Sequence, residues 1–149
     1  ERWTMGLRDL YERCAGYLAA GASFVTWRCD YSVPPGRQMG GPSKSCVERN
    51  TRDMAVFCKV AMAAGLVPVI HPQVSPEGSH DCSEGAFFTE RVLFSTFSAL
   101  QEHGVPLTAV VLMSGFARHG AGCDSLERTM DPSEATLRVF LNVVPASVP

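Results

Sequence analysis

Hydrophobic residues follow one another along this chain in two alternating patterns. One pattern has the 3.6-residue spacing of an amphipathic helix, and the other is the short apolar run of a buried strand. The first predicts four helices, at residues 5–20, 42–64, 83–103 and 131–144. The second predicts three strands, at residues 24–29, 66–70 and 107–113. Because strands that alternate with helices of this length form parallel sheets, the pattern predicts an α/β fold in the order α-β-α-β-α-β-α.

Glycine and proline mark the ends of the predicted elements. Gly21, Gly65 and Gly104 each follow the last apolar position of a helix, where glycine commonly ends a helix. Segments rich in glycine, proline and small polar residues are predicted to be loops, at residues 32–41, 72–81 and 114–128. No repeat and no linker interrupts this order, so residues 1–149 are predicted to form a single domain.

The first predicted strand has two chemically different faces. Alternation places Phe24, Thr26 and Arg28 on one face and three less polar residues on the other. The second face is suited to lie beneath helices. The first ends in a hydroxyl and a guanidinium, which is typical of the end of a sheet or barrel that holds a ligand.

Composition and charge narrow the classes of function. The chain is 46% hydrophobic and 19% charged, as in ordinary globular proteins. Its formal net charge of −2 argues against non-specific binding of nucleic acid or anionic membranes. No apolar run approaches the roughly 18–20 residues of a membrane span, so we expect a soluble protein. The chain starts at Glu1 without a signal peptide, and processed product, fragment and observed part of a longer protein all remain open.

Candidate metal ligands are present but poorly spaced. His80, Cys82, His119 and Cys123 are of the types that zinc prefers, yet their spacing fits no compact zinc motif. The six cysteines contain no C-x-x-C pair, so reduced thiols are expected and a disulfide framework is the less favoured alternative. Gly120–Gly122 lacks the lysine and hydroxyl of a phosphate-binding P-loop. We therefore predict no metal and no cofactor.

Several short motifs together resemble class I fructose-bisphosphate aldolase, the Schiff-base type. They include Trp27-Arg28-Cys29, Pro76-Glu77-Gly78-Ser79-His80-Asp81 and Thr89-Glu90-Arg91-Val92-Leu93. Others lie at residues 12–15, 65–68, 120–123, 144–145 and 148–149. The resemblance covers the whole chain but only the middle of the family's (β/α)8 barrel. It implies a partial TIM-type barrel with about three parallel strands.

The resemblance also implies where catalytic groups would stand. The family's imine-forming lysine falls at Met113, and a thioether cannot form an imine. A second active-site lysine falls at Thr26, and two proton-transferring glutamates fall at His71 and Gln73. Of the matched positions only Arg28, similar to a substrate-phosphate contact, is kept. Catalysis by His71 as a general base is not favoured, because no nucleophile is identifiable beside it.

These replacements lead to a hypothesis about function. The chain is interpreted as a catalytically inactive aldolase-like structural or accessory subunit of a larger assembly, and so not an enzyme. Since three parallel strands leave one face and two edges bare, other protein subunits are expected to cover them, and a lone monomer is not expected to be stable. The sequence does not identify the compartment; the usual fate of repurposed enzymes suggests a plastid or mitochondrion.

Two alternatives stay open. The chain is either a fragment of an active class I fructose-bisphosphate aldolase of glycolysis or gluconeogenesis, or a non-catalytic module that binds a sugar phosphate through Arg28. The first requires a lysine at a strand end, whereas Lys44 and Lys59 both fall on the second predicted helix.

Overall fold

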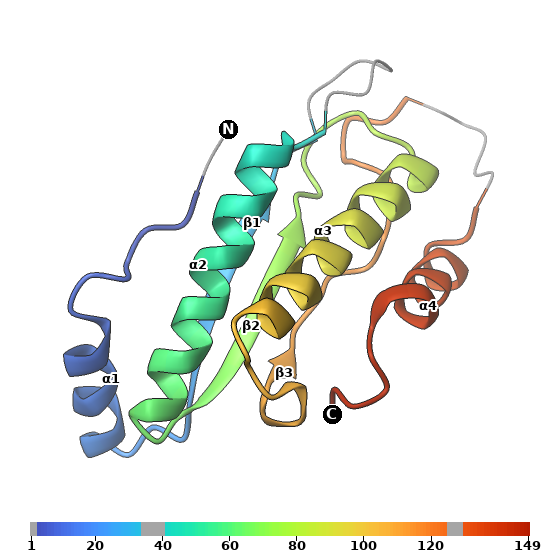
Figure 1. The fold of residues 1–149 in the computed structure, drawn as a ribbon. Coiled ribbons are helices and arrows are strands. Elements are labelled where there is room, and N and C mark those ends of the chain that lie inside the picture. Colours follow the sequence, from blue (N-terminus) through green and yellow to red (C-terminus); the bar gives the residue numbers. More distant parts are fainter. Residues whose placement is uncertain (1–2, 34–40, 125–129) are drawn as a thin grey trace.

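A three-stranded parallel sheet with helices on one side forms the centre of the molecule (Figure 1). The computed structural model describes residues 3–33, 41–124 and 130–149. The strands are β1 (Phe24–Tyr31), β2 (Val67–Val74) and β3 (Val111–Leu112), in the spatial order β1-β2-β3. The helices are α1 (Leu10–Ala19), α2 (Lys44–Ala63), α3 (Cys82–Glu102) and α4 (Pro132–Val143), with a short 3-10 helix at Leu107–Ala109. The predicted α/β class and the part of a TIM-type barrel are confirmed.

Most element boundaries differ from those predicted. The first helix begins at Leu10 rather than at residue 5, because Gly6 and Asp9 adopt positive φ angles of 137° and 51° that an α-helix excludes. The strands β1 and β2 run on to Tyr31 and Val74. Most of the predicted loop 32–41 and the end of the loop 114–128 lie outside the described residues.

The third strand is the largest departure from the sequence pattern. The apolar run 107–113 was predicted as one strand, but Leu107–Ala109 turns as a 3-10 helix and only two residues pair with β2. Pro72 is tolerated within β2 because β3 pairs with β2 only at Val69 and Ile70, which leaves that side of Pro72 without a ladder partner. Residues 113–124, which follow β3, form an irregular loop, and the carbonyl of Arg118 in it lies against Gly85 of α3.

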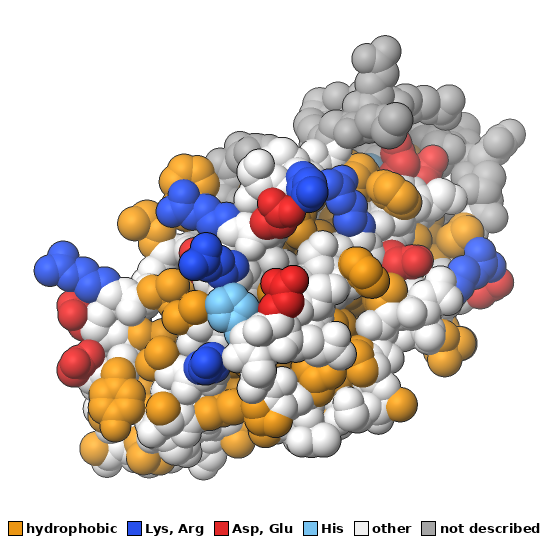
Figure 2. Space-filling view, in the orientation of Figure 1, with side chains coloured by type: hydrophobic (Ala, Val, Ile, Leu, Met, Phe, Trp, Pro, Cys, Tyr) orange, Lys and Arg blue, Asp and Glu red, His pale blue; other side chains and the backbone are white. Residues whose placement is uncertain are grey.

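The hydrophobic core lies between the sheet and the helices. Trp27, Cys29 and Tyr31 of β1 are buried on this face, and Trp27 packs on Phe57 of α2 with ring centroids 5.2 Å apart. Burial raises the pKa of the Cys29 thiol to about 11 and that of Cys58 to about 12, so these free thiols stay protonated and act as small hydrophobic groups. Figure 2 shows the surface of α2 and α3 that faces away from the sheet, where charged and hydrophobic side chains are mixed.

The other face of the sheet is open. Phe24 is 62% exposed, Val67 44% and Met113 49%. Each occupies one of the alternate strand positions whose side chains point into a closed barrel. This inward face, defined by the alternate residues Phe24–Asp30 of β1 and Val67–Gln73 of β2 together with Val111 and Met113, carries the candidate site. In the described residues no helix is both long and apolar enough to cross a bilayer.

Candidate functional site

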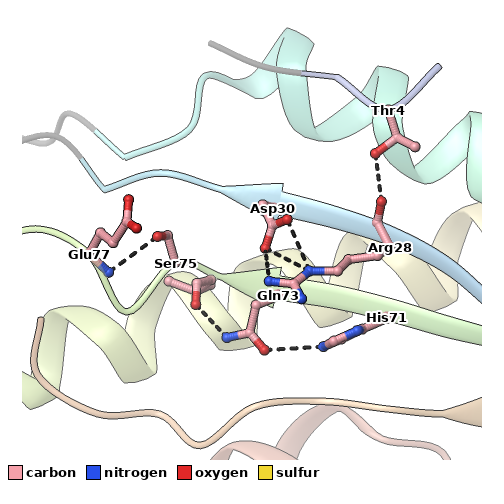
Figure 3. A network of polar contacts seen from close by, with 8 residues as sticks. Thr4, Arg28, Asp30, His71, Gln73, Ser75 and Glu77 are labelled. Atoms are coloured by element: carbon pink, nitrogen blue, oxygen red, sulfur yellow. Dashed lines mark hydrogen bonds and ion pairs between the residues drawn. The ribbon is translucent and has the colours of Figure 1, made fainter.

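Strand register places the predicted site residues on neighbouring positions of the inward face. Arg28 pairs with His71, and Asp30 pairs with Gln73, at the carboxyl ends of β1 and β2 (Figure 3). Thr26 pairs with Val69, one step back toward the amino ends. The backbone N–H of Met113 donates to the carbonyl of Ile70 at 2.9 Å, which brings Met113 beside His71. In parallel α/β sheets this end holds the ligand.

Arg28 is held by a carboxylate that the sequence analysis did not single out. Its Nε lies 3.0 Å from both carboxylate oxygens of Asp30, and its Nη2 lies 2.8 Å from Oδ1. Hydrogen bonding and the charge of Asp30 raise the pKa of Arg28 above its ordinary value. In the sequence, Arg28 and Asp30 are two positions apart, a spacing that puts both side chains on the same face of a strand and could have revealed this pair. The Nη1 group has no hydrogen-bond partner among the described residues, so it is accessible to a ligand.

His71 and Gln73 form a second contact on the same face. His71 Nε2 lies 3.3 Å from Gln73 Oε1, and Gln73 Nε2 donates to the carbonyl of Val74 at 2.5 Å. The loop after β3 packs tightly against this amide, since a Cβ built on Gly115 would lie 2.4 Å from Gln73 Oε1. The two side chains therefore form a positioned polar contact without a carboxylate.

No lysine of the chain stands beside these residues. Lys44 begins α2, and its amine lies 3.6 Å from the Glu48 carboxylate; Lys59 is an exposed residue of the same helix. Thr26 and Met113 are exposed on the inward face, and their assignment to the family's lysine positions stays a prediction. These side chains offer no amine for covalent chemistry.

A pocket of about 260 Å³ opens next to Arg28. It lies between the end of β2, the first turns of α3 and the loop after β3. Its lining is mostly polar or glycine: Arg28, Gln73, Val74, Ser75, Pro76, His80, Gly85, Thr89, Gly115, Phe116 and Arg118. The second arginine, Arg118, escaped the sequence analysis because it follows β3 in an irregular loop with no periodic signal. The pocket thus combines two guanidinium groups with hydroxyl and amide groups.

One buried histidine forms the wall of this pocket. His80 is 4% exposed, and its Nδ1 has no hydrogen-bond partner within the described part of the chain; the nearby backbone of Gly78 and Gly120 shields it. Burial lowers the pKa of His80 below its ordinary value, although the Arg118 backbone and the charges of Glu84 and Asp81 oppose the shift. Among the described residues, no three His, Cys, Asp or Glu side chains gather as metal ligands would.

The whole chain matches one family of enzymes. Residues 1–149 match the family model for fructose-bisphosphate aldolase class-I. The chain belongs to the class-I fructose-bisphosphate aldolase family. It is 34% identical over 149 residues to the muscle-type aldolase of Lethenteron camtschaticum and 34% identical to fructose-bisphosphate aldolase 1 of Toxoplasma gondii; each alignment covers 100% of this chain and 40% of the relative.

A solved aldolase shares the fold of this aldolase-family chain. The structure of fructose-bisphosphate aldolase from Plasmodium falciparum superposes with a TM-score of 0.91 at 31% identity, over 99% of this chain and 42% of that protein. The chain therefore spans about 40% of the length of the aldolases it matches. The suspected resemblance and its partial extent are both confirmed.

The expectation that this chain is not an enzyme is wrong. Its relatives over the full 149 residues are named fructose-bisphosphate aldolases, so it belongs to a family of enzymes and not to a class of structural subunits. The side chains of a segment that spans about 40% of an aldolase do not decide the activity of the whole protein. An active site assembled by a barrel also draws on strands outside the chain.

The buried His80 makes the stability of this aldolase segment depend on pH. Its native pKa is below 6.5, so the unfolded state takes up a proton first, and the free energy of unfolding falls as the pH falls below about 6.5 toward the native pKa. Above about pH 6.5 the contribution of His80 to the free energy of unfolding is fully present. Urea unfolding at several pH values between about 7.5 and 5.5 measures how much of this free energy is lost.

The substitution His80→Gln is expected to flatten this pH dependence, because glutamine does not titrate. Because the charge of His119 also contributes to lowering the pKa of His80, His119 is left unchanged in this experiment. Equal slopes for the wild type and the His80→Gln protein would contradict the role given to His80.

Proposed function

We propose that the chain is a segment of a fructose-bisphosphate aldolase and that the complete protein cleaves fructose 1,6-bisphosphate. The observation that carries this proposal is the match of all 149 residues to the aldolase family, with a TM-score of 0.91 to a solved aldolase. This segment contributes the sugar-phosphate pocket at the carboxyl ends of β1 and β2. Within it, Arg28 contacts a phosphate group of the substrate, as the family resemblance implies.

The pair between Arg28 and Asp30 is compatible with this role. Both side chains are about half exposed, at 56% and 44%, and ion pairs of this kind contribute only about 0–1 kcal/mol. A phosphate dianion accepts several charge-assisted hydrogen bonds from a guanidinium. Substrate phosphate therefore binds the free Nη1, or displaces part of the carboxylate contact, at small cost. Until then Asp30 keeps the long Arg28 side chain oriented.

Imine formation requires an amine that this segment does not bring to the site. A primary amine adds to the ketose carbonyl and water leaves, so a lysine must reach the bound substrate. Lys44 and Lys59 lie on α2, and Thr26 and Met113 have no amine. Since the family's position for this lysine falls at Met113, we propose that an imine in the complete protein uses a different lysine, outside these 149 residues.

The inward face supports a proposal about what surrounds the segment. Parallel sheets are almost always covered on both faces, and here Phe24, Val67 and Met113 are exposed. Polypeptide outside these residues, in the same barrel or in another subunit, covers this face. The compartment stays a prediction; a plastid or mitochondrial location is not supported by any structural feature described above.

Two measurements on the full-length protein test the proposal. A coupled assay should detect triose phosphate release from fructose 1,6-bisphosphate, and borohydride reduction during turnover should fix the ketose on a lysine outside residues 1–149. Absence of cleavage would contradict the proposed activity. Binding of the sugar phosphate without cleavage would favour the binding-module alternative instead.

A further inference from the structure

We propose that Arg118 is a second phosphate-binding residue, and that it holds a phosphate group together with Arg28 across the pocket. Arg118 lies in the loop after β3 and lines the same pocket as Arg28. The inference deepens the proposed function, since it names a further contact for the sugar phosphate. Binding of phosphate by itself, however, does not require that the protein cleave a sugar.

The first support is the charge of the pocket. Among the described residues, its lining includes two arginines and no aspartate or glutamate. The only carboxylate bonded to these arginines among the described residues is Asp30, which contacts Arg28. Arg118 makes no ion pair with any described residue. The described part of the pocket thus has one uncompensated positive charge, which favours an anion.

The second support is the fixed backbone around Arg118. Next to it, the N–H of Ala117 donates to Thr136 Oγ1 at 2.9 Å, and the N–H of Gly120 donates to the carbonyl of His80 at 2.9 Å. The carbonyl of Arg118 itself lies so close to α3 that a Cβ on Gly85 would be 2.4 Å from its oxygen. The backbone of this loop is therefore already ordered before an anion binds, and only the Arg118 side chain loses rotamer freedom.

The third support is the size of the pocket and the nature of its other polar groups. A volume of about 260 Å³ is below the roughly 300–1,000 Å³ of pockets for drug-sized ligands, and it suits a small anion such as a phosphate with a short carbon chain. The Ser75 hydroxyl accepts from the N–H of Glu77, which leaves its proton available to an anion (Figure 3). Because Ser75 lines the same pocket as Arg28 and Arg118, it adds a neutral donor to the two cations.

Footprinting of the full-length wild-type protein tests this assignment directly. Phenylglyoxal modifies accessible arginines, and peptide mass spectrometry reads each site separately. Inorganic phosphate is expected to slow modification of Arg118 and Arg28 several-fold. Arg138 is the internal control, because it is an exposed residue of α4 that pairs with Glu134 outside the pocket. Equal modification of Arg118 with and without phosphate would overturn the assignment.

Matched variants give the second measurement. By calorimetric titration with inorganic phosphate, Arg118→Ala is expected to weaken binding about tenfold, the loss of one charge-assisted hydrogen bond. Arg138→Ala removes the same charge and should bind as the wild type does. Equal affinities of the two variants would also refute the role of Arg118.

The outcome for Arg118 can be separated from the outcome for the proposed function. Cleavage of fructose 1,6-bisphosphate with no protection of Arg118 would overturn the inference and leave the aldolase proposal standing. Protection of Arg118 in a protein that cleaves no sugar phosphate would support the inference and contradict the proposed activity.

Discussion

Replacing Gly85 by alanine is expected to destabilise the protein by about 2–3 kcal/mol and to disturb the loop that carries Arg118. An alanine Cβ at this position would lie 2.4 Å from the Arg118 carbonyl oxygen and 3.3 Å from its carbonyl carbon. Both are backbone atoms, so no side-chain rotation relieves the overlap. The loop or the start of α3 must move, and the pocket between them changes shape. Urea unfolding measures the loss of stability.

A second glycine in a helix provides the control. Gly16 lies within α1, and a Cβ there would meet no atom within 4 Å. Gly16→Ala should therefore stabilise the protein by about 0.5–1 kcal/mol, because alanine favours a helix. Gly85→Ala should also reduce phosphate protection of Arg118. If both variants shift stability by the same amount and in the same direction, the close approach of α3 to this loop has no energetic consequence.

The elements that the sequence predicted well are those set by local periodicity. Trp27 and Cys29 face the helices and Thr26 and Arg28 face away, as alternation required. The start of α3 was also readable, because Asp81 and Glu84 form a capping box around its first turn. Such features depend on residues only a few positions apart, so no knowledge of the tertiary structure is needed.

The pocket could be predicted only in part, because its residues come from distant segments. Arg28 and Gln73 were selected by family resemblance, but Arg118 reaches them through the irregular chain after a strand of only two residues. The apolar composition of residues 107–113 gave no indication that Leu107–Ala109 forms a 3-10 helix. Asp30 was missed since the prediction ended β1 at Cys29, and the pair with Arg28 requires the strand to continue to the next residue. Long-range packing, not local preference, assembled the site.

Substitution of Met113 by lysine is expected to create an amine that forms an imine at this position. Met113 is 49% exposed on the inward face, so the longer charged side chain has access to solvent and needs no buried cavity. It lies beside His71, which pairs with Arg28, so the new amine would stand on the same face as the proposed phosphate contact, with one strand between them. Reduction with borohydride in the presence of a ketose phosphate should fix the sugar on residue 113.

A lysine one step back on the same face is the matched control. Val111 is 39% exposed and shares the inward face, but it pairs with Val69, farther from Arg28 and from the pocket. Because imine formation depends on how the bound carbonyl is positioned, Met113→Lys should trap at least about tenfold more ketose phosphate than Val111→Lys. Peptide mass spectrometry locates the adduct. Equal trapping at 113 and 111 would show that the carboxyl ends of these strands do not orient the sugar. Selective trapping at 113 would show that the carbonyl of the sugar reaches residue 113 while its phosphate is bound at Arg28.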